Sequence, residues 1–133
     1  MPPKAGDKGS PQDWMRLARA DLALASVPLP PHALYELLCF HAQQAVEKSL
    51  KAILVKKGID FPPTHNLQIL IDLLPKAIKK DKVLTTVAGM TIYAVTSRYP
   101  SEIESVTQDE YQEALQAANE VVAWVQAIPD LLT

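Results

Sequence analysis

The chain is 133 residues long, with 48% hydrophobic residues, 21% charged residues and a formal net charge of −2 at pH 7. This length fits one domain with a modest core, and the small negative charge argues against a broadly basic surface for nucleic acid without excluding a local patch. Glycine is scarce and no segment sustains a period-two alternation, so the composition favours helices over sheet.

Residues 1–9 are rich in proline, glycine and lysine, and we expect them to form a disordered leader. No apolar stretch follows Lys4 and Lys8 to complete a secretion signal, and no run of about eighteen apolar residues could span a membrane. The single cysteine, Cys39, cannot form an intrachain disulfide. These features predict a cytoplasmic protein.

The first two predicted helices are separated by a proline-rich segment at residues 27–31. The first runs from Pro11 to about Ser26, because Ser10 can cap it and proline suits its first position. The second is the longest. It opens at Pro31 and lasts until Gly58, where two preceding lysines complement the helix C-terminus.

Three further helices follow. A short one is capped by Thr64 or Asn66 and ends at Pro75. The next begins between Pro75 and Lys82 and stops before Pro100, since the residue before a proline disfavours helix.

The last helix starts at a capping box formed by Thr107 and Glu110 and is closed by Pro129. The pattern predicts an all-α, up-and-down bundle of four to five helices over residues 10–128, followed by a tail at 129–133.

The second helix has two faces with different chemistry. One is a stripe of apolar and small residues. The other places polar side chains between apolar ends: Leu37, His41, Gln44, Lys48, Lys51 and Val55. A helix that needed only solubility would not end its polar face in leucine and valine, so we expect both faces to contact protein. We therefore predict a symmetric homodimer with this helix at or near the interface.

Two charged residues interrupt apolar stripes, Asp21 in the first helix and Arg98 at the end of the fourth. An unpaired buried charge is costly, so we expect Asp21 to pair with Arg98 or Lys48. Such a pair would either fix the helix register or line a charged cleft for a ligand.

The centre of the polar face permits two interpretations. Gln44, Lys48 and Lys51 could bind a phosphate-bearing ligand, because ammonium groups neutralise phosphate and an amide orients an oxygen. They could instead form a polar dimer seam, in which Gln44 and Glu47 hydrogen-bond across the two-fold axis. The apolar ends of the helix favour the seam slightly.

The histidines are candidates for proton transfer. His41 could act as a general acid or base, or could simply satisfy a hydrogen bond. We expect His65 to anchor the start of the third helix through its ring nitrogens. No histidine pair or Cys-x-x-Cys has metal-ligand spacing, and neither a nucleophile motif nor a glycine-rich phosphate loop is present, so we expect no metal and no cofactor.

Four sequence blocks occur in a specific order: Ala18, Asp21, Leu22 and Ala25; then Gln44-Ala45-x-Glu47-Lys48-x-Leu50-Lys51; then Thr64-His65-Asn66-Leu67; then Ser97-Arg98-Tyr99-Pro100. From about Trp14 to Val125 the chain resembles the HEPN domain family. The resemblance implies a small α-helical bundle, usually dimeric and often encoded beside a minimal nucleotidyltransferase. Some members of the family are metal-independent ribonucleases.

The ribonucleases of this family carry an arginine followed a few residues later by a histidine, but no histidine follows Arg98 here. The resemblance therefore implies a non-catalytic or weakly catalytic subunit of a toxin–antitoxin-like module. This subunit would bind a minimal nucleotidyltransferase, and a nucleotide or RNA is a further candidate ligand. One alternative is a ribonuclease toxin that uses Arg98 with His41 or Tyr99. A purely structural or regulatory interaction protein is the other.

Overall fold

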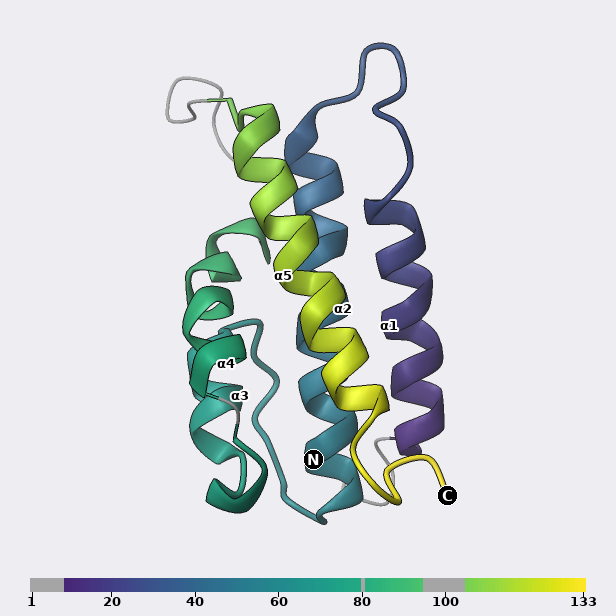
Figure 1. The fold of residues 1–133 in the computed structure, drawn as a ribbon, viewed down its shortest axis with the longest axis vertical. Helices are drawn as coiled ribbons and strands as arrows, with labels where there is room; N and C mark the ends of the chain where they lie inside the picture. The colour runs from purple at the N-terminus through teal and green to yellow at the C-terminus, as the bar shows by residue number, and fades with distance from the viewer. Residues whose placement is uncertain (1–8, 80, 95–104) are drawn as a thin grey trace.

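The computed structural model describes residues 9–79, 81–94 and 105–133. These residues form the predicted all-α bundle, with no strand in the described ranges (Figure 1). Its elements are α1 (Pro11–Ala25), α2 (Tyr35–Lys56), α3 (Leu67–Leu73), the 3-10 helix η2 (Lys76–Ile78), α4 (Asp81–Val87), the 3-10 helix η3 (Ala88–Ala94) and α5 (Gln108–Gln126). None of the described helices combines the length and apolar content needed to cross a membrane.

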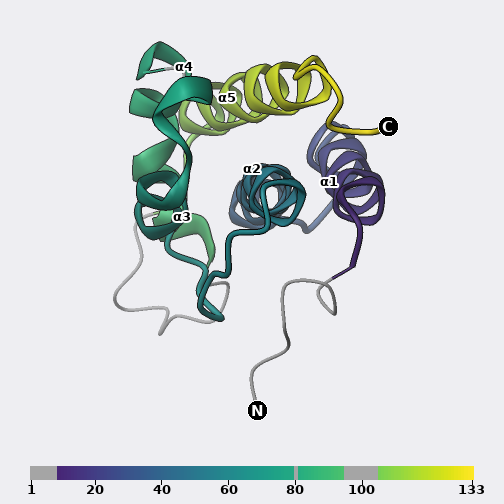
Figure 2. The ribbon, with the colours of Figure 1, turned by 90° about the horizontal axis from the view of Figure 1, so that it is seen from below.

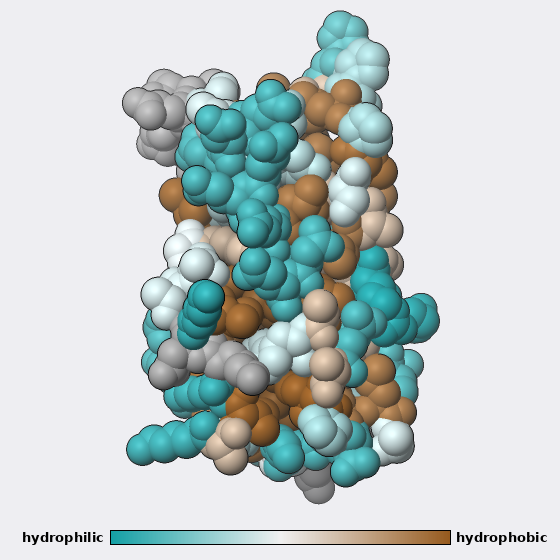
Figure 3. Space-filling view, viewed as in Figure 1, coloured by the Kyte–Doolittle hydropathy of each residue, from teal (hydrophilic) through white to brown (hydrophobic). Residues whose placement is uncertain are grey.

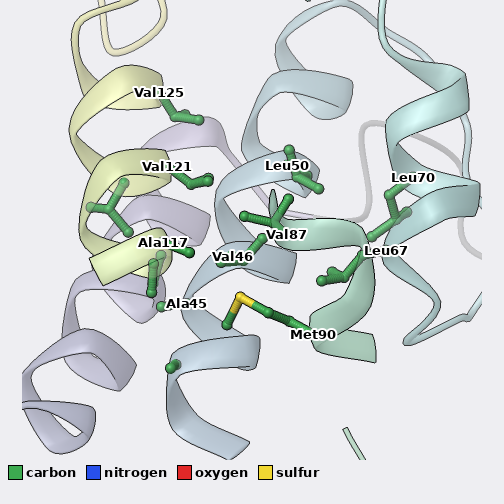
Figure 4. Packing of buried hydrophobic residues seen from close by; sticks show 14 of the residues in the cluster. Ala45, Val46, Leu50, Leu67, Leu70, Val87, Met90, Ala117, Val121 and Val125 are labelled. Carbon is green, nitrogen blue, oxygen red and sulfur yellow. The ribbon is translucent and has the colours of Figure 1, made fainter. Parts of the chain in front are cut away.

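Helix α2 is the central element of the bundle. Seen end-on, it is surrounded on three sides by α1, by α5 and by the segment from α3 to η3 (Figure 2). Its buried residues Val46 and Leu50 meet Val87 and Met90 from α4 and η3, while Val121 approaches from α5 (Figure 4). The core covers most of the small and apolar stripe predicted for this helix and also buries residues outside that stripe.

Local sequence signals set most helix ends. The predicted capping box at Thr107 and Glu110 is present before α5, and a second one pairs Ser10 with Asp13 before α1. Of the two caps considered for α3, Asn66 is the one used, since its side chain accepts from the N–H of the second helical residue.

The C-terminus of α2 follows a Schellman pattern. Gly58 has a φ of 67°, its N–H donates to the carbonyl of Val55, and the N–H of Ile59 donates to the carbonyl of Leu54. A residue without Cβ adopts this left-handed conformation at no steric cost, which explains the predicted stop at this glycine.

Two predicted boundaries were wrong. Helix α2 begins at Tyr35 rather than Pro31, because His32 has a φ of 68°, which no right-handed helix contains. The predicted fourth helix is split at Ala88, where α4 tightens into η3 beside Gly89, a residue with poor helix propensity. Its predicted end before Pro100 lies outside the described residues.

Candidate functional site

The first part of the site joins α1 to α2 through Asp21. This residue is 8% exposed, and its two carboxylate oxygens have different partners. Lys48 Nζ donates to Oδ2 over 2.5 Å, and Nδ1 of His41 is 2.9 Å from Oδ1. The predicted pairing of Asp21 with Lys48 is thus present, whereas the alternative partner Arg98 lies outside the described residues.

This arrangement fixes how α1 lies along α2. His41 and Lys48 are seven residues apart, about two helical turns, so both project from one face of α2. Asp21 reaches between them, and a shift of α1 by one turn would break both hydrogen bonds. The Asp21 contacts therefore set the helix register and at the same time place an imidazole beside an ammonium group.

The second part of the site is centred on Glu47, which is only 2% exposed. Its Oε1 accepts from the side-chain amides of Gln43 and Gln44, each over 3.3 Å, and lies 2.9 Å from Nδ1 of His65. Its Oε2 accepts from Lys51 Nζ over 3.0 Å. A carboxylate removed from water needs this number of donors.

These contacts bear on two sequence-based expectations. A hydrogen bond between Gln44 and Glu47 across a two-fold axis stays a prediction; within one chain the amide of Gln44 already donates to Glu47, and the carboxylate is buried. His65 was expected to anchor the start of α3, yet its ring contacts Glu47 of α2 while Asn66 caps α3.

Gln43 was missed by the sequence analysis. It is fully buried, and its amide also donates to the backbone carbonyl of His65 over 3.2 Å. The available signal was the spacing of Gln43, Glu47 and Lys51, because residues four apart on a helix are neighbours.

The two lysines differ in their access to a ligand. Lys51 Nζ lies 5.5 Å from the ring centroid of Trp14 and 5.6 Å from that of Phe61, which adds cation–π contacts to its ion pair with Glu47. The side chain of Lys48 is 22% exposed. An ammonium group has three donors, so Lys48 could still donate to an external anion beside Asp21.

Both histidines contact a carboxylate through the same ring nitrogen. His41 and His65 each contact a carboxylate through Nδ1, and within the described residues Nε2 of neither ring is hydrogen-bonded. An ionised carboxylate can only accept, so beside one Nδ1 donates, and in that tautomer Nε2 is free to act as an acceptor. A carboxylate that orients an imidazole in this way is suited to proton transfer.

The polar face of α2, defined here as His41, Gln44, Lys48 and Lys51, is bordered by apolar surface. On α1, Leu17 and Leu24 lie four residues before and three residues after Asp21, and therefore on its side of the helix. Leu24 is 50% exposed and Leu37 of α2 is 49% exposed. The two carboxylates and two ammonium groups balance in charge, so these exposed leucines lie near a cluster whose charges are paired within the chain.

The remaining candidates do not add to this site. Burial, with smaller contributions from Glu36 and Glu110, raises the pKa of the Cys39 thiol to about 12, so it stays protonated at neutral pH. His32 is exposed in the loop before α2. The described part of the chain contains no group of three or more residues able to hold a metal ion. Tyr99 lies outside that part.

Comparisons with known proteins place this architecture among related chains. A family model described as the HEPN domain matches residues 11–128. The crystal structure of TT1696 from Thermus thermophilus is similar, with a TM-score of 0.71 and 27% identity over 87% of this chain and 95% of that chain. The crystal structure of ST0689, described as an archaeal HEPN homologue, has a TM-score of 0.66 and 26% identity over 89% and 96%. No curated protein matches.

Proposed function

The chain belongs to the HEPN domain family, and from this premise we propose that it is a non-catalytic or weakly catalytic HEPN subunit that forms a homodimer in the cytoplasm. In this proposal it works with a separately encoded minimal nucleotidyltransferase, as part of a toxin–antitoxin-like module. The polar face of α2 lies at or near the dimer interface and contributes to binding a nucleotide or a phosphate-bearing substrate.

One observation carries the proposal: the polar face is internally satisfied and is bordered by exposed leucines. Asp21 and Glu47 already receive donors from their own chain, so covering them with a second subunit would leave no charge unpaired. Burying Leu24 and Leu37 would then contribute hydrophobic stabilisation to the interface.

The dimer is tested by sedimentation velocity on wild type and on Leu37→Glu. The substitution places a charge in the proposed interface, so the variant should sediment as a smaller species than wild type. Ile69→Glu is the matched control, because Ile69 is a similarly exposed apolar residue on α3. The proposed interface would be contradicted if both variants dissociate to the same extent. It would also be contradicted if the wild type is a monomer at micromolar concentration.

Nucleotide binding is tested by calorimetric titration with ATP and AMP. Lys48→Gln should weaken binding because Lys48 is the accessible cation of the polar face, whereas the exposed Lys57→Gln should leave affinity unchanged. If wild type and both variants bind the nucleotide with the same affinity, the polar face does not contribute to nucleotide binding.

The nucleotidyltransferase partner is tested by sequencing the reading frames beside this gene and co-expressing any minimal nucleotidyltransferase that they encode. A stoichiometric complex that survives gel filtration would support the proposal. If no complex forms and no nucleotide binds, the alternative of a purely structural or regulatory interaction protein becomes the better account.

The contact between Asp21 and His41 favours a second candidate function, a metal-independent ribonuclease. In that function His41 Nε2 would accept the 2′-hydroxyl proton, and a nearby cation would stabilise the phosphate. The lack of a histidine after Arg98 argues against it, since a positioned proton-transfer group contributes about 100- to 10,000-fold in rate. Strong wild-type RNA cleavage in the presence of chelator, lost in both His41→Ala and Arg98→Ala, would make this the primary function.

A further inference from the structure

A hollow of about 420 Å³ lies between η2 and the C-terminal end of α5. Ile78 lines one wall, and Trp124 and Ile128 line the other. All three side chains are partly buried and pack against the hydrophobic core. In the space-filling view, hydrophobic surface is exposed toward the lower end of the molecule, where α5 ends (Figure 3). We call this cavity the Trp124 hollow, and it offers apolar surface to a ligand.

The Trp124 hollow has one charged residue among its described lining residues, Lys79. This lysine follows η2 and is partly buried. Its ammonium group takes part in none of the ion pairs or side-chain hydrogen bonds of the described residues. Residue 80, which lies outside the described residues, is also a lysine and therefore cannot neutralise Lys79. An ammonium group in this setting attracts an anionic group that can accept its hydrogen bonds.

Trp124 supplies a second means of recognition. An indole is a large apolar surface, and aromatic pairs gain free energy beyond their buried area when they pack offset or edge-to-face. Trp124 belongs to none of the aromatic pairs formed among the described residues. Its ring is therefore available to pack against the ring of a ligand.

The size and lining of the hollow limit the class of ligand. Small-molecule pockets have volumes of about 300–1,000 Å³ and are mostly apolar, with a few polar groups that fix the orientation of the ligand. The Trp124 hollow lies at the small end of this range, which suits a ligand with one ring better than a nucleotide with its base, ribose and phosphates. The single cation of the described lining matches one carboxylate.

We propose that the Trp124 hollow binds a small aromatic carboxylic acid in its ionised form. The ring of the ligand packs between Ile78 and Trp124, and its carboxylate accepts from Lys79 Nζ. No residue of the polar face of α2 lines this hollow, so the site is separate from the nucleotide site of the proposed function. The two sites can be tested independently for the same reason.

Tryptophan fluorescence offers a direct measurement, because the chain has only two tryptophans. Trp14→Phe leaves Trp124 as the sole indole. Within the described residues the buried indole nitrogen of Trp14 has no hydrogen-bond partner, so phenylalanine keeps an aromatic ring there and removes no hydrogen bond. Titration of full-length Trp14→Phe with phenylpropanoate should change the Trp124 emission in a saturable way.

The neutral amide of the same acid tests the role of charge. Phenylpropanamide has the same ring and linker, but it cannot form an ion pair with Lys79. It should bind about tenfold more weakly, which is the low end expected for losing a hydrogen bond between charged groups, since Lys79 is partly exposed. Equal affinities for acid and amide would overturn the proposal. Octanoate that binds as tightly as phenylpropanoate would overturn the assignment of an aromatic ligand.

A substitution at Lys79 supplies the matching test on the protein. In the Trp14→Phe background, Lys79→Gln should weaken phenylpropanoate binding about tenfold and leave the affinity for the amide unchanged. Lys82→Gln is the control, because Lys82 is exposed on α4 and does not line the hollow, and it should bind as its parent does. Circular dichroism confirms that each variant is folded. An unchanged affinity in Lys79→Gln would refute the proposed role of this lysine.

Nuclear magnetic resonance locates the ligand independently of fluorescence. In ¹⁵N-labelled Trp14→Phe, the one remaining indole N–H signal belongs to Trp124 and should shift on addition of phenylpropanoate. The backbone signals of Ile78, Lys79 and Ala127 should shift with it, since these residues line the hollow. Shifts confined to the polar face of α2, or no shift at saturating ligand, would overturn the proposed site.

Discussion

Replacing Asp21 by alanine should destabilise the fold because it removes the acceptor shared by two partners. Breaking a fully buried ion pair costs about 3–5 kcal/mol, and an exposed pair contributes about 0–1 kcal/mol. The side chains of Lys48 and His41 are 22% and 31% exposed, so water can partly solvate them after the carboxylate is lost. We therefore expect a loss of about 2 kcal/mol, between these limits.

This loss can be converted into a melting temperature. Unfolding entropy is about 2.1 cal/mol/K per residue near 60 °C, so for 133 residues a loss of about 2 kcal/mol lowers Tm by roughly 7 °C. Urea titration followed by circular dichroism gives the free energy of unfolding directly, and an unchanged m-value would show that only stability has changed. Because dimerisation also affects apparent stability, all variants are compared at one protein concentration.

A double-mutant cycle isolates the contact with Lys48. Asp21→Ala, Lys48→Met and the double variant should give a coupling of about 1 kcal/mol or more, as expected for residues in direct contact. Asp72→Ala is the control, since this carboxylate accepts from Gln68 on its own helix, and it should cost less than about 0.5 kcal/mol. A loss from Asp21→Ala no larger than that of the control, or a coupling near zero, would refute the reasoning.

Three further predictions concern single positions. Glu47→Gln should destabilise by about 3 kcal/mol, more than Asp21→Ala, because it leaves the nearly buried Lys51 unpaired; a smaller loss in urea titration would contradict this ranking. Cys39 should react with Ellman's reagent only as fast as the protein unfolds. In the folded protein the pKa of this thiol is about 12, above the ordinary value of 9.0. The contribution of the buried thiol to the free energy of unfolding is therefore complete below pH 9 and is lost as pH rises toward 12. Denaturation at pH 8 and at pH 11 measures the difference. Gly58→Ala should cost about 1 kcal/mol from its positive φ alone, since a Cβ there meets no atom within 4 Å, and equal melting temperatures for the two proteins would disprove it.

Much of the local structure follows from short sequence signals. The Thr107 capping box and the positive-φ glycine at Gly58 set helix ends through contacts within a few residues. The interruption of an apolar stripe by Asp21 also predicts a buried acid that needs a cation. These inferences succeed because the interacting groups are close in sequence or because burial restricts the possible chemistry.

The identity of the partners was decided by tertiary structure. Lys48 contacts Asp21 because α1 and α2 pack side by side at one register, and His65 reaches Glu47 because the loop before α3 returns to α2. The ammonium group of Lys51 lies near the rings of Trp14, which precedes it in the sequence, and Phe61, which follows it. The helical period places a side chain on a face but carries no information about which distant segment covers that face. Long-range packing determines that choice, and with it whether a polar residue stays accessible to a ligand.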